Sequence, residues 1–242
     1  MEKRPIFEPE TSMWDGALDL LPDFKLNLDS SAFLIVDMQY LDAHPDFGMG
    51  RRAKETGTFE QFSYYFKTIK EIIPRISALQ KICRERGLDV MFAKIACYLK
   101  DCRDVSPQHK RVNFYAPPGS REAEILEELA PLEDELILIK GCSGVFNSTA
   151  IDQILRNMGI DTLIICGVTT DGCVGNAVRD ASDRGYYVIL VGDACATVSP
   201  EDHAFGLRCV NNAACKVMTT QQVIDLIVAA ETRPEAASRN VG

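Results

Sequence analysis

The chain has 242 residues, of which 46% are hydrophobic and 25% charged, and its formal net charge is −9 at pH 7. This composition is ordinary for a globular protein and excludes disordered, collagen-like and coiled-coil chains. A negative charge of this size repels phosphate backbones and anionic lipid, so we expect neither nucleic acid nor membrane as a partner. At this length a single α/β domain can form one core.

The start of the chain, MEKRPIFEPETSMWDG, is polar and lacks the apolar segment of a secretory signal. No stretch approaches the roughly 18 apolar residues that cross a bilayer. The nine cysteines are odd in number and lack C-x-x-C spacing, so we expect reduced thiols. These features together predict a cytoplasmic location.

From residue 31 onward, short β-branched runs alternate with longer amphipathic runs, which is typical of a parallel sheet covered by helices. The predicted strands are 32–37, 89–95, 135–140, 162–167, 186–193 and 215–219. The predicted helices are 63–86, 121–129, 148–158, 173–184, 201–213 and 220–231. The expected fold is therefore a three-layer, Rossmann-like α/β/α domain with a six-stranded parallel sheet.

The domain is expected to span residues 29–231, between an N-terminal arm at 1–28 and a C-terminal tail at 232–242. Pro74 falls inside the first long helical pattern. A proline there predicts either a kink or the true first turn of that helix.

Three potentially reactive side chains are expected at the carboxyl-terminal edge of the sheet. Asp37 and Lys140 each close an apolar strand, and Cys173 opens the helix after the fourth strand. In a parallel sheet these ends lie on one rim, where ligands bind. Two long stretches that follow strands, 41–59 and 97–120, are expected to be lids or binding loops over that rim.

Cys173 lies in the first turn of its predicted helix, where Thr170 or Asp171 can serve as the N-cap. A thiol there faces free backbone N–H groups and the positive end of the helix dipole, which favours its thiolate. By position alone, a structural cysteine at a helix start is the simpler interpretation. The coincidence of Asp37 and Lys140 on the same rim favours a nucleophile.

Four short motifs, in this order, resemble the isochorismatase-like cysteine hydrolases over residues 30–230. They are an Asp-x-Gln after the first strand, a Lys followed by Ser-x-x-Phe and Thr, the segment GVTTDGCV with its RDA continuation, and a later GDA. In this sequence they correspond to Asp37 and Gln39; to Lys140, Ser143, Phe146 and Thr149; to 167–174 and 179–181; and to 192–194.

The resemblance implies a catalytic triad of Asp37, Lys140 and Cys173. In such enzymes the Asp takes the thiol proton, the Lys favours the charged forms and the thiolate attacks a carbonyl carbon. The resemblance also implies a non-proline cis peptide between Val168 and Thr169, which turns the N–H groups of Thr169 and Cys173 into an oxyanion hole. A neighbouring cation and a helix start are expected to lower the pKa of Cys173 below its usual value of about 8.5.

Within that family, a cysteine at the position of Cys173 points to the amidohydrolase branch, which includes N-carbamoylsarcosine, ureidoacrylate, biuret and maleamate hydrolases. The expected function is cleavage of a carbon–nitrogen bond in a small ureide or amide through a thioester, with release of ammonia. Two alternatives stay open: an isochorismatase-type hydrolase of a vinyl ether, and a catalytically silent binding or scaffold member. The same resemblance implies a homodimer or homotetramer.

No cofactor is expected, because GVTTDGCVG has neither G-x-G-x-x-G nor G-K-[ST]. The nicotinamidase branch of the family binds a divalent ion through an Asp-x-His pair and a further His. The segment KIACYLKDCRD, where that branch would supply a ligand, has no histidine, so no metal is expected. Of the three histidines, His203 is expected on a helix surface or in packing, whereas a substrate role stays open for His44 and His109 in the lids.

Overall fold

The computed structural model of the protein describes residues 25–230. Within them, six parallel strands form one sheet in the order β3-β2-β1-β4-β5-β6. The strands are β1 (Ser31–Val36), β2 (Asp89–Ile95), β3 (Leu136–Lys140), β4 (Thr162–Val168), β5 (Tyr187–Ala196) and β6 (Lys216–Met218). Each predicted strand overlaps an observed one, and the predicted α/β fold with its six-stranded parallel sheet is confirmed.

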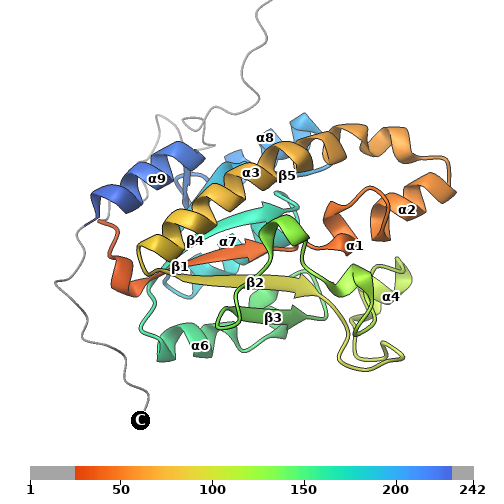
Figure 1. The fold of residues 1–242 in the computed structure, drawn as a ribbon, viewed down its shortest axis with the longest axis horizontal. Helices are drawn as coiled ribbons and strands as arrows, with labels where there is room; N and C mark the ends of the chain where they lie inside the picture. Colours follow the sequence, from red (N-terminus) through yellow and green to blue (C-terminus); the bar gives the residue numbers. More distant parts are fainter. Residues whose placement is uncertain (1–24, 231–242) are drawn as a thin grey trace, which may run out of the picture.

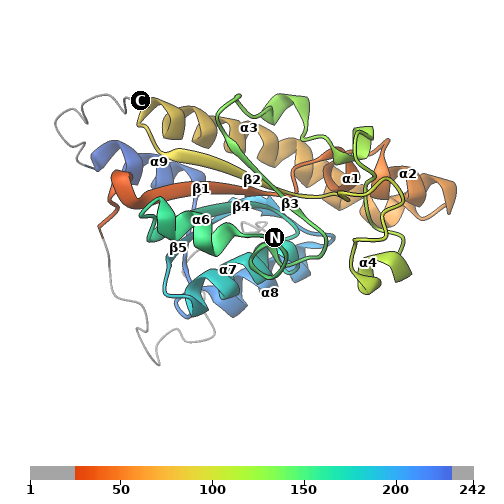
Figure 2. The same cartoon turned by 90° about the horizontal axis from the view of Figure 1, so that it is seen from below.

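Helices cover both faces of this sheet. The helices of the described residues are α1 (Tyr40–Ala43), α2 (Gly48–Glu55), α3 (Ser63–Glu85), α4 (Pro107–Arg111), α5 (Val145–Ser148), α6 (Ile151–Asn157), α7 (Cys173–Asp183), α8 (Pro200–Val210) and α9 (Thr220–Ala229). Helices α3 and α9 lie on one face, and α6, α7 and α8 on the other (Figure 2). In this part of the chain, no helix is both long and apolar enough to cross a membrane.

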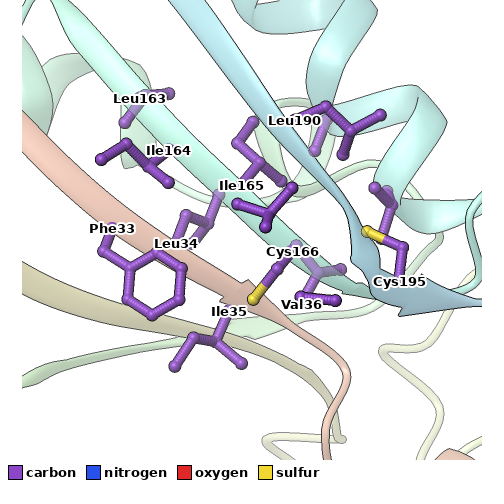
Figure 3. Packing of buried hydrophobic residues seen from close by; sticks show 14 of the residues in the cluster. Phe33, Leu34, Ile35, Val36, Leu163, Ile164, Ile165, Cys166, Leu190 and Cys195 are labelled. Atoms are coloured by element: carbon purple, nitrogen blue, oxygen red, sulfur yellow. The ribbon is translucent and has the colours of Figure 1, made fainter. Parts of the chain in front are cut away.

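The two central strands are buried on both faces, which explains their continuous apolar sequence. All six residues of β1 and all seven of β4 are buried. Figure 3 shows Leu34 and Ile35 of β1 packed beside Ile165 and Cys166 of β4. Because this centre is closely packed, it fixes the positions of the residues that follow each strand.

The carboxyl ends of β1 and β2 meet α1, α2 and α4 at one end of the molecule (Figure 1). The stretches 41–59 and 97–120 were expected to be long loops. The structure instead contains helices in both: most of α1 and all of α2 fall in the first stretch, and α4 falls in the second. Gly48 begins α2 with a positive φ of 43°, where a Cβ would lie 2.1 Å from the Leu41 carbonyl oxygen. The first stretch is therefore a compact helical cap rather than an open lid.

One predicted helix is wrong. Residues 121–129 form two short 3-10 turns, Arg121–Ala123 and Glu127–Leu129, in place of a helix. The backbone between these turns pairs with the segment after β1, through bonds from the Tyr40 N–H to the Glu124 carbonyl and from the Leu126 N–H to the Met38 carbonyl. These pairings replace the hydrogen bonds that a helix would have used.

Pro74 lies inside α3 and does not mark the first turn of that helix. The expected N-terminal arm, 1–28, is described only from residue 25, and there Leu26 and Leu28 are buried in the main core. Residues 1–24 and the expected tail, 232–242, lie outside the described part of the chain.

Candidate active site

Asp37 follows β1 directly and is buried at the centre of the sheet's carboxyl edge. Its exposed fraction is 0% and its φ is 54°, a left-handed conformation that few residues other than glycine adopt. Its N–H donates to the Ala93 carbonyl of β2 at 2.8 Å, and its own carbonyl accepts from the Gln39 N–H at 2.8 Å. The backbone thus turns sharply at Asp37 and keeps the carboxylate at the strand end.

Lys140 ends β3 and joins the other two expected site residues. Its Nζ lies 2.9 Å from Asp37 Oδ2 and 3.4 Å from Cys173 Sγ, and it also donates to the Cys142 carbonyl at 3.2 Å. The side chain of Lys140 is fully buried. The structure therefore brings Asp37, Lys140 and Cys173 together, although they come from three separate strand ends.

Cys173 is the first residue of α7 and is partly buried. The N-cap residue of α7 is Gly172, with no side-chain cap, so the expectation of Thr170 or Asp171 was wrong. The two side chains bond elsewhere: Thr170 Oγ1 pairs with His203 Nδ1 at 2.8 Å, and Asp171 Oδ1 accepts from Thr197 Oγ1 at 2.6 Å. The turn before Cys173 is thus held by His203 of α8 and by Thr197, which follows β5.

The peptide bond between Val168 and Thr169 is cis, at the position expected from the sequence. The Thr169 carbonyl accepts from the N–H groups of Gly172 at 3.0 Å and Val174 at 3.2 Å. Among the described residues, no acceptor bonds to the N–H of Thr169 or of Cys173. Both N–H groups are therefore available on the turn that carries the thiol.

Burial dominates the electrostatics of the three side chains. It raises the pKa of Asp37, against the opposing charge of Lys140. It also raises the pKa of the Cys173 thiol, and the Asp37 charge adds to this effect while Lys140 opposes it. Burial disfavours the charge of Lys140, but Asp37 and Cys173 outweigh it and raise the pKa of Lys140.

The expected lowering of the Cys173 pKa is therefore not found. The sequence places a cation and a helix start next to the thiol, but it does not show that burial outweighs both effects on the pKa. In this geometry burial and the Asp37 charge both favour the protonated thiol. A carboxylate with a raised pKa is also a stronger base.

Gln39 ties the edge of the sheet to the segment that covers it. Its Nε2 donates to the carbonyls of Ile95 and Glu122, each at 2.9 Å, and its Oε1 accepts from the Ile95 N–H at 2.6 Å. The side chain is fully buried, so these bonds are protected from water. The glutamine of the Asp-x-Gln motif thus holds β1, β2 and the 120–126 segment in register.

Two buried polar residues near the triad, Asp42 and Tyr65, were missed from the sequence. Their exposed fractions are 6% and 0%. Among the described residues, Asp42 Oδ2 and the Tyr65 hydroxyl have no hydrogen-bond partner. The only sequence signal for Asp42 was an acidic residue inside the otherwise apolar turn YLDA.

The histidines differ in their surroundings. His203 is buried rather than on a helix surface, and burial lowers its pKa to about 4 against the opposing charge of Asp171. His109 is also buried, and its Nε2 lies 3.4 Å from Ser143 Oγ. His44 packs edge-on against Phe47.

A pocket of about 780 Å³ lies between the two stretches that were expected to cover the site. Its lining includes Arg51, Arg52 and Met49 from α2, Phe114 and Tyr115 from the other stretch, and Glu122 just after that stretch. Asp37, Lys140 and Cys173 do not line it. Leu41 and Phe114 do, and both belong to the small apolar cluster against which Cys173 packs. These two side chains therefore connect the lining of the pocket to the apolar cluster against which Cys173 packs.

Within residues 25–230, no group of three His, Cys, Asp or Glu side chains is arranged to hold a metal ion. The three expected site residues instead form a cluster of one carboxylate, one ammonium group and one thiol.

Known proteins resemble this chain in sequence. It is 32% identical over 163 residues to the uncharacterized isochorismatase family protein YwoC of Bacillus subtilis, an alignment that covers 65% of this chain and 84% of that protein. It is 25% identical to the N-carbamoylsarcosine amidase of Arthrobacter and 26% identical to the enterobactin synthase component B of Escherichia coli K12, over 66% and 72% of this chain. These alignments span only 62% and 59% of the two enzymes' own lengths.

Among solved structures, a cysteine hydrolase from Pseudomonas syringae pv. phaseolicola 1448A superposes with a TM-score of 0.72 at 25% identity. That superposition covers 86% of this chain and 97% of the other. The sequence model described as the isochorismatase domain matches residues 31–222. The chain therefore belongs to the isochorismatase family of hydrolases.

Proposed function

We propose that this hydrolase is a cysteine-dependent amidohydrolase that cleaves a carbon–nitrogen bond in a small ureide or amide. One observation carries the proposal: the Lys140 ammonium contacts both the Asp37 carboxylate, at 2.9 Å, and the Cys173 sulfur, at 3.4 Å. A carboxylate, an ammonium group and a thiol in one buried cluster support the roles of base, cation and nucleophile. The similarity to a protein named N-carbamoylsarcosine amidase supports this choice of bond.

In the proposed reaction, Asp37 takes the proton from Cys173 Sγ as the sulfur bonds to the carbonyl carbon. As the proton moves, negative charge passes from the Asp37 carboxylate to the sulfur. The Lys140 ammonium contacts both groups and stabilises this charge. The free N–H groups of Thr169 and Cys173 are the donors for the carbonyl oxygen as it becomes an oxyanion. Asp37 then returns the proton to the nitrogen, which leaves as ammonia, and water hydrolyses the thioester.

The resting state described above is consistent with this order of events. Burial and the Asp37 charge raise the pKa of Cys173 and so favour a protonated thiol before a carbonyl carbon is in place. The proton transfer and the attack are then coupled, and the empty site does not expose a permanent thiolate to oxidants.

The proposal is tested by ammonia release from a panel of small ureides and primary amides, with and without EDTA, beside an assay for isochorismate hydrolysis. We expect ammonia from at least one ureide or amide, at a rate that EDTA leaves unchanged. Hydrolysis of isochorismate with no ammonia from the panel would instead support the vinyl ether reaction. Loss of ammonia release in EDTA would contradict the expectation that no metal takes part.

A further inference from the structure

The ammonium group of Lys140 has a third acceptor, which the proposed reaction does not use. Besides the Asp37 carboxylate and the Cys173 sulfur, the ammonium contacts the Cys142 carbonyl, to which it donates at 3.2 Å. An ammonium group has three N–H donors, so these three contacts occupy all of them. The direction of the ammonium group between the carboxylate and the sulfur therefore depends on where the Cys142 carbonyl lies.

That carbonyl belongs to the segment 141–143, which directly follows β3. Helix α4 and its N-cap residue, Ser106, hold this segment on both sides of the carbonyl. On one side, the Ser106 N–H donates to the Gly141 carbonyl at 2.8 Å. On the other side, His109 Nε2 lies 3.4 Å from Ser143 Oγ. The position of the carbonyl is thus set by α4 as well as by the strand.

His109 is itself held firmly, and only 3% of its surface is exposed. Its N–H donates to Ser106 Oγ at 3.2 Å, and its carbonyl accepts from the Phe114 N–H at 2.9 Å. Its ring packs edge-on against the Phe114 ring, with the centroids 5.8 Å apart. Because Nδ1 has no hydrogen-bond partner in the described part of the chain, the polar contact of the ring there is the one with Ser143.

We propose that His109 is a positioning residue for Lys140. Through Ser143 it holds the Cys142 carbonyl in place, and that carbonyl keeps the ammonium group directed toward Cys173. This inference rests on the proposed function, in which the ammonium group stabilises charge on the sulfur. Without this hold, the ammonium group would turn toward the carboxylate and away from the sulfur.

The test compares two substitutions of His109 that fill similar space. His109→Gln keeps a donor and an acceptor for Ser143 Oγ, whereas His109→Leu keeps only the packing. We expect His109→Leu to lower kcat about tenfold with KM nearly unchanged, as the loss of one hydrogen bond would give, and His109→Gln to keep most of the wild-type kcat. Equal kcat values for the two variants would overturn the inference.

The pH dependence of Cys173 alkylation gives a second readout. Burial first, and then the charges of Asp37 and Asp42, raise the pKa of this thiol, and the Lys140 charge opposes them. If the ammonium group turns away from the sulfur, this opposition weakens. The profile for iodoacetamide, followed by mass spectrometry of the modified peptide, should therefore move to higher pH in His109→Leu. Burial lowers the pKa of His109, so its ring is uncharged above pH 7 and does not itself shift the profile. An unchanged profile would contradict the proposal.

Two further variants assign the effect to the contact between His109 and Ser143. Ser143→Ala removes the other partner and should shift the profile in the same direction. The double variant with His109→Leu should be no slower than the slower single variant, because both changes remove one contact. Losses that multiply in the double variant would refute the assignment. If His109→Leu does not fold, Ser143→Ala decides, and a wild-type profile in that variant would overturn the inference.

Gln108→Leu is the matched control, because Gln108 is exposed at the preceding position of α4. Its kcat and its alkylation profile should be those of the wild type, and a shift equal to that of His109→Leu would count against a specific role for His109.

A melting curve separates positioning from a general effect on stability. His109→Leu should melt close to the wild type, because it replaces a buried ring whose Nδ1 has no partner in the described structure with an apolar side chain. A large decrease in the melting temperature, shared by His109→Gln, would indicate a purely structural ring and contradict the proposal.

Alkylation of Cys173 needs no turnover, so this inference and the proposed function can fail separately. A shifted profile without ammonia from any compound tested would keep the positioning role of His109 and remove the amidohydrolase. Ammonia release that depends on Cys173, at a rate that His109→Leu leaves unchanged, would keep the amidohydrolase and remove the positioning role.

Discussion

The Lys140 ammonium lies 2.9 Å from the Asp37 carboxylate, and neither side chain exposes more than 1% of its surface. Removal of water makes such a pair dependent on both partners, because either charge alone would be buried without compensation. The pair therefore links the stability of the fold to the chemistry proposed for the site.

Lys140→Met should lower the free energy of unfolding by about 3–5 kcal/mol, because it leaves the Asp37 charge buried and unpaired. The double variant Lys140→Met with Asp37→Asn should recover much of this loss, yet remain inactive. Urea denaturation of the wild type, both single variants and the double variant measures the coupling. Strictly additive losses in the double variant would show that the two groups do not depend on each other.

Asp37→Asn should change turnover and thiol reactivity in opposite directions. The Asp37 charge raises the pKa of Cys173, so its removal increases the thiolate fraction at a given pH. Alkylation of Cys173 by iodoacetamide should therefore become faster, and its pH profile should move to lower pH. Ammonia release should collapse, because the base is lost. Slower alkylation in the variant would contradict the electrostatic account.

Gly167→Ala should disrupt the contact between β1 and β4 that places Asp37 beside the Cys173 turn. A Cβ at Gly167 would lie 2.0 Å from the Val36 carbonyl oxygen, and the φ of this glycine is 118°. Gly185→Ala is a suitable control, since Gly185 has a positive φ of 88° but open space around it. We expect a loss of about 1–2 kcal/mol for Gly185→Ala, from backbone strain alone, and a clearly larger loss for Gly167→Ala. Similar melting temperatures for the two variants would refute this.

His203 should make the fold sensitive to mild acid. Burial lowers its pKa from 6.5 to about 4, so between these pH values the unfolded chain binds a proton that the folded protein does not. Stability is then complete above pH 6.5 and falls as the pH drops toward 4, by up to about 3 kcal/mol. His203→Gln should weaken this pH dependence in urea denaturation at pH 7 and pH 4.5. An unchanged dependence would show that His203 is not the group responsible.

The sheet was predictable because its central strands are buried on both faces. The runs AFLIV and LIIC are continuously apolar. Apolar runs of this length, separated by amphipathic segments, leave few alternatives to a parallel sheet. The ends of these strands were predictable for the same reason, and they carry Asp37 and the turn before Cys173.

Features that depend on contacts between distant segments were not predictable from local pattern. Residues 124–126 pair with the backbone after β1, so a segment that reads as a helix adopts two short turns instead. Burial is likewise a property of the whole fold: it reverses the expected shift in the pKa of Cys173 and makes Asp42 an internal residue. For Asp42 the sequence offers only an acidic residue inside the otherwise apolar turn YLDA.

The most direct test of the central claim is the rate of ammonia release by Cys173→Ala beside the wild type, on any ureide or amide that the wild type hydrolyses. Cys173→Ala should fold normally and release no ammonia above the uncatalysed rate, because it lacks the sulfur that forms the thioester. Ammonia release by the folded Cys173→Ala protein at the wild-type rate would show that Cys173 is not the nucleophile.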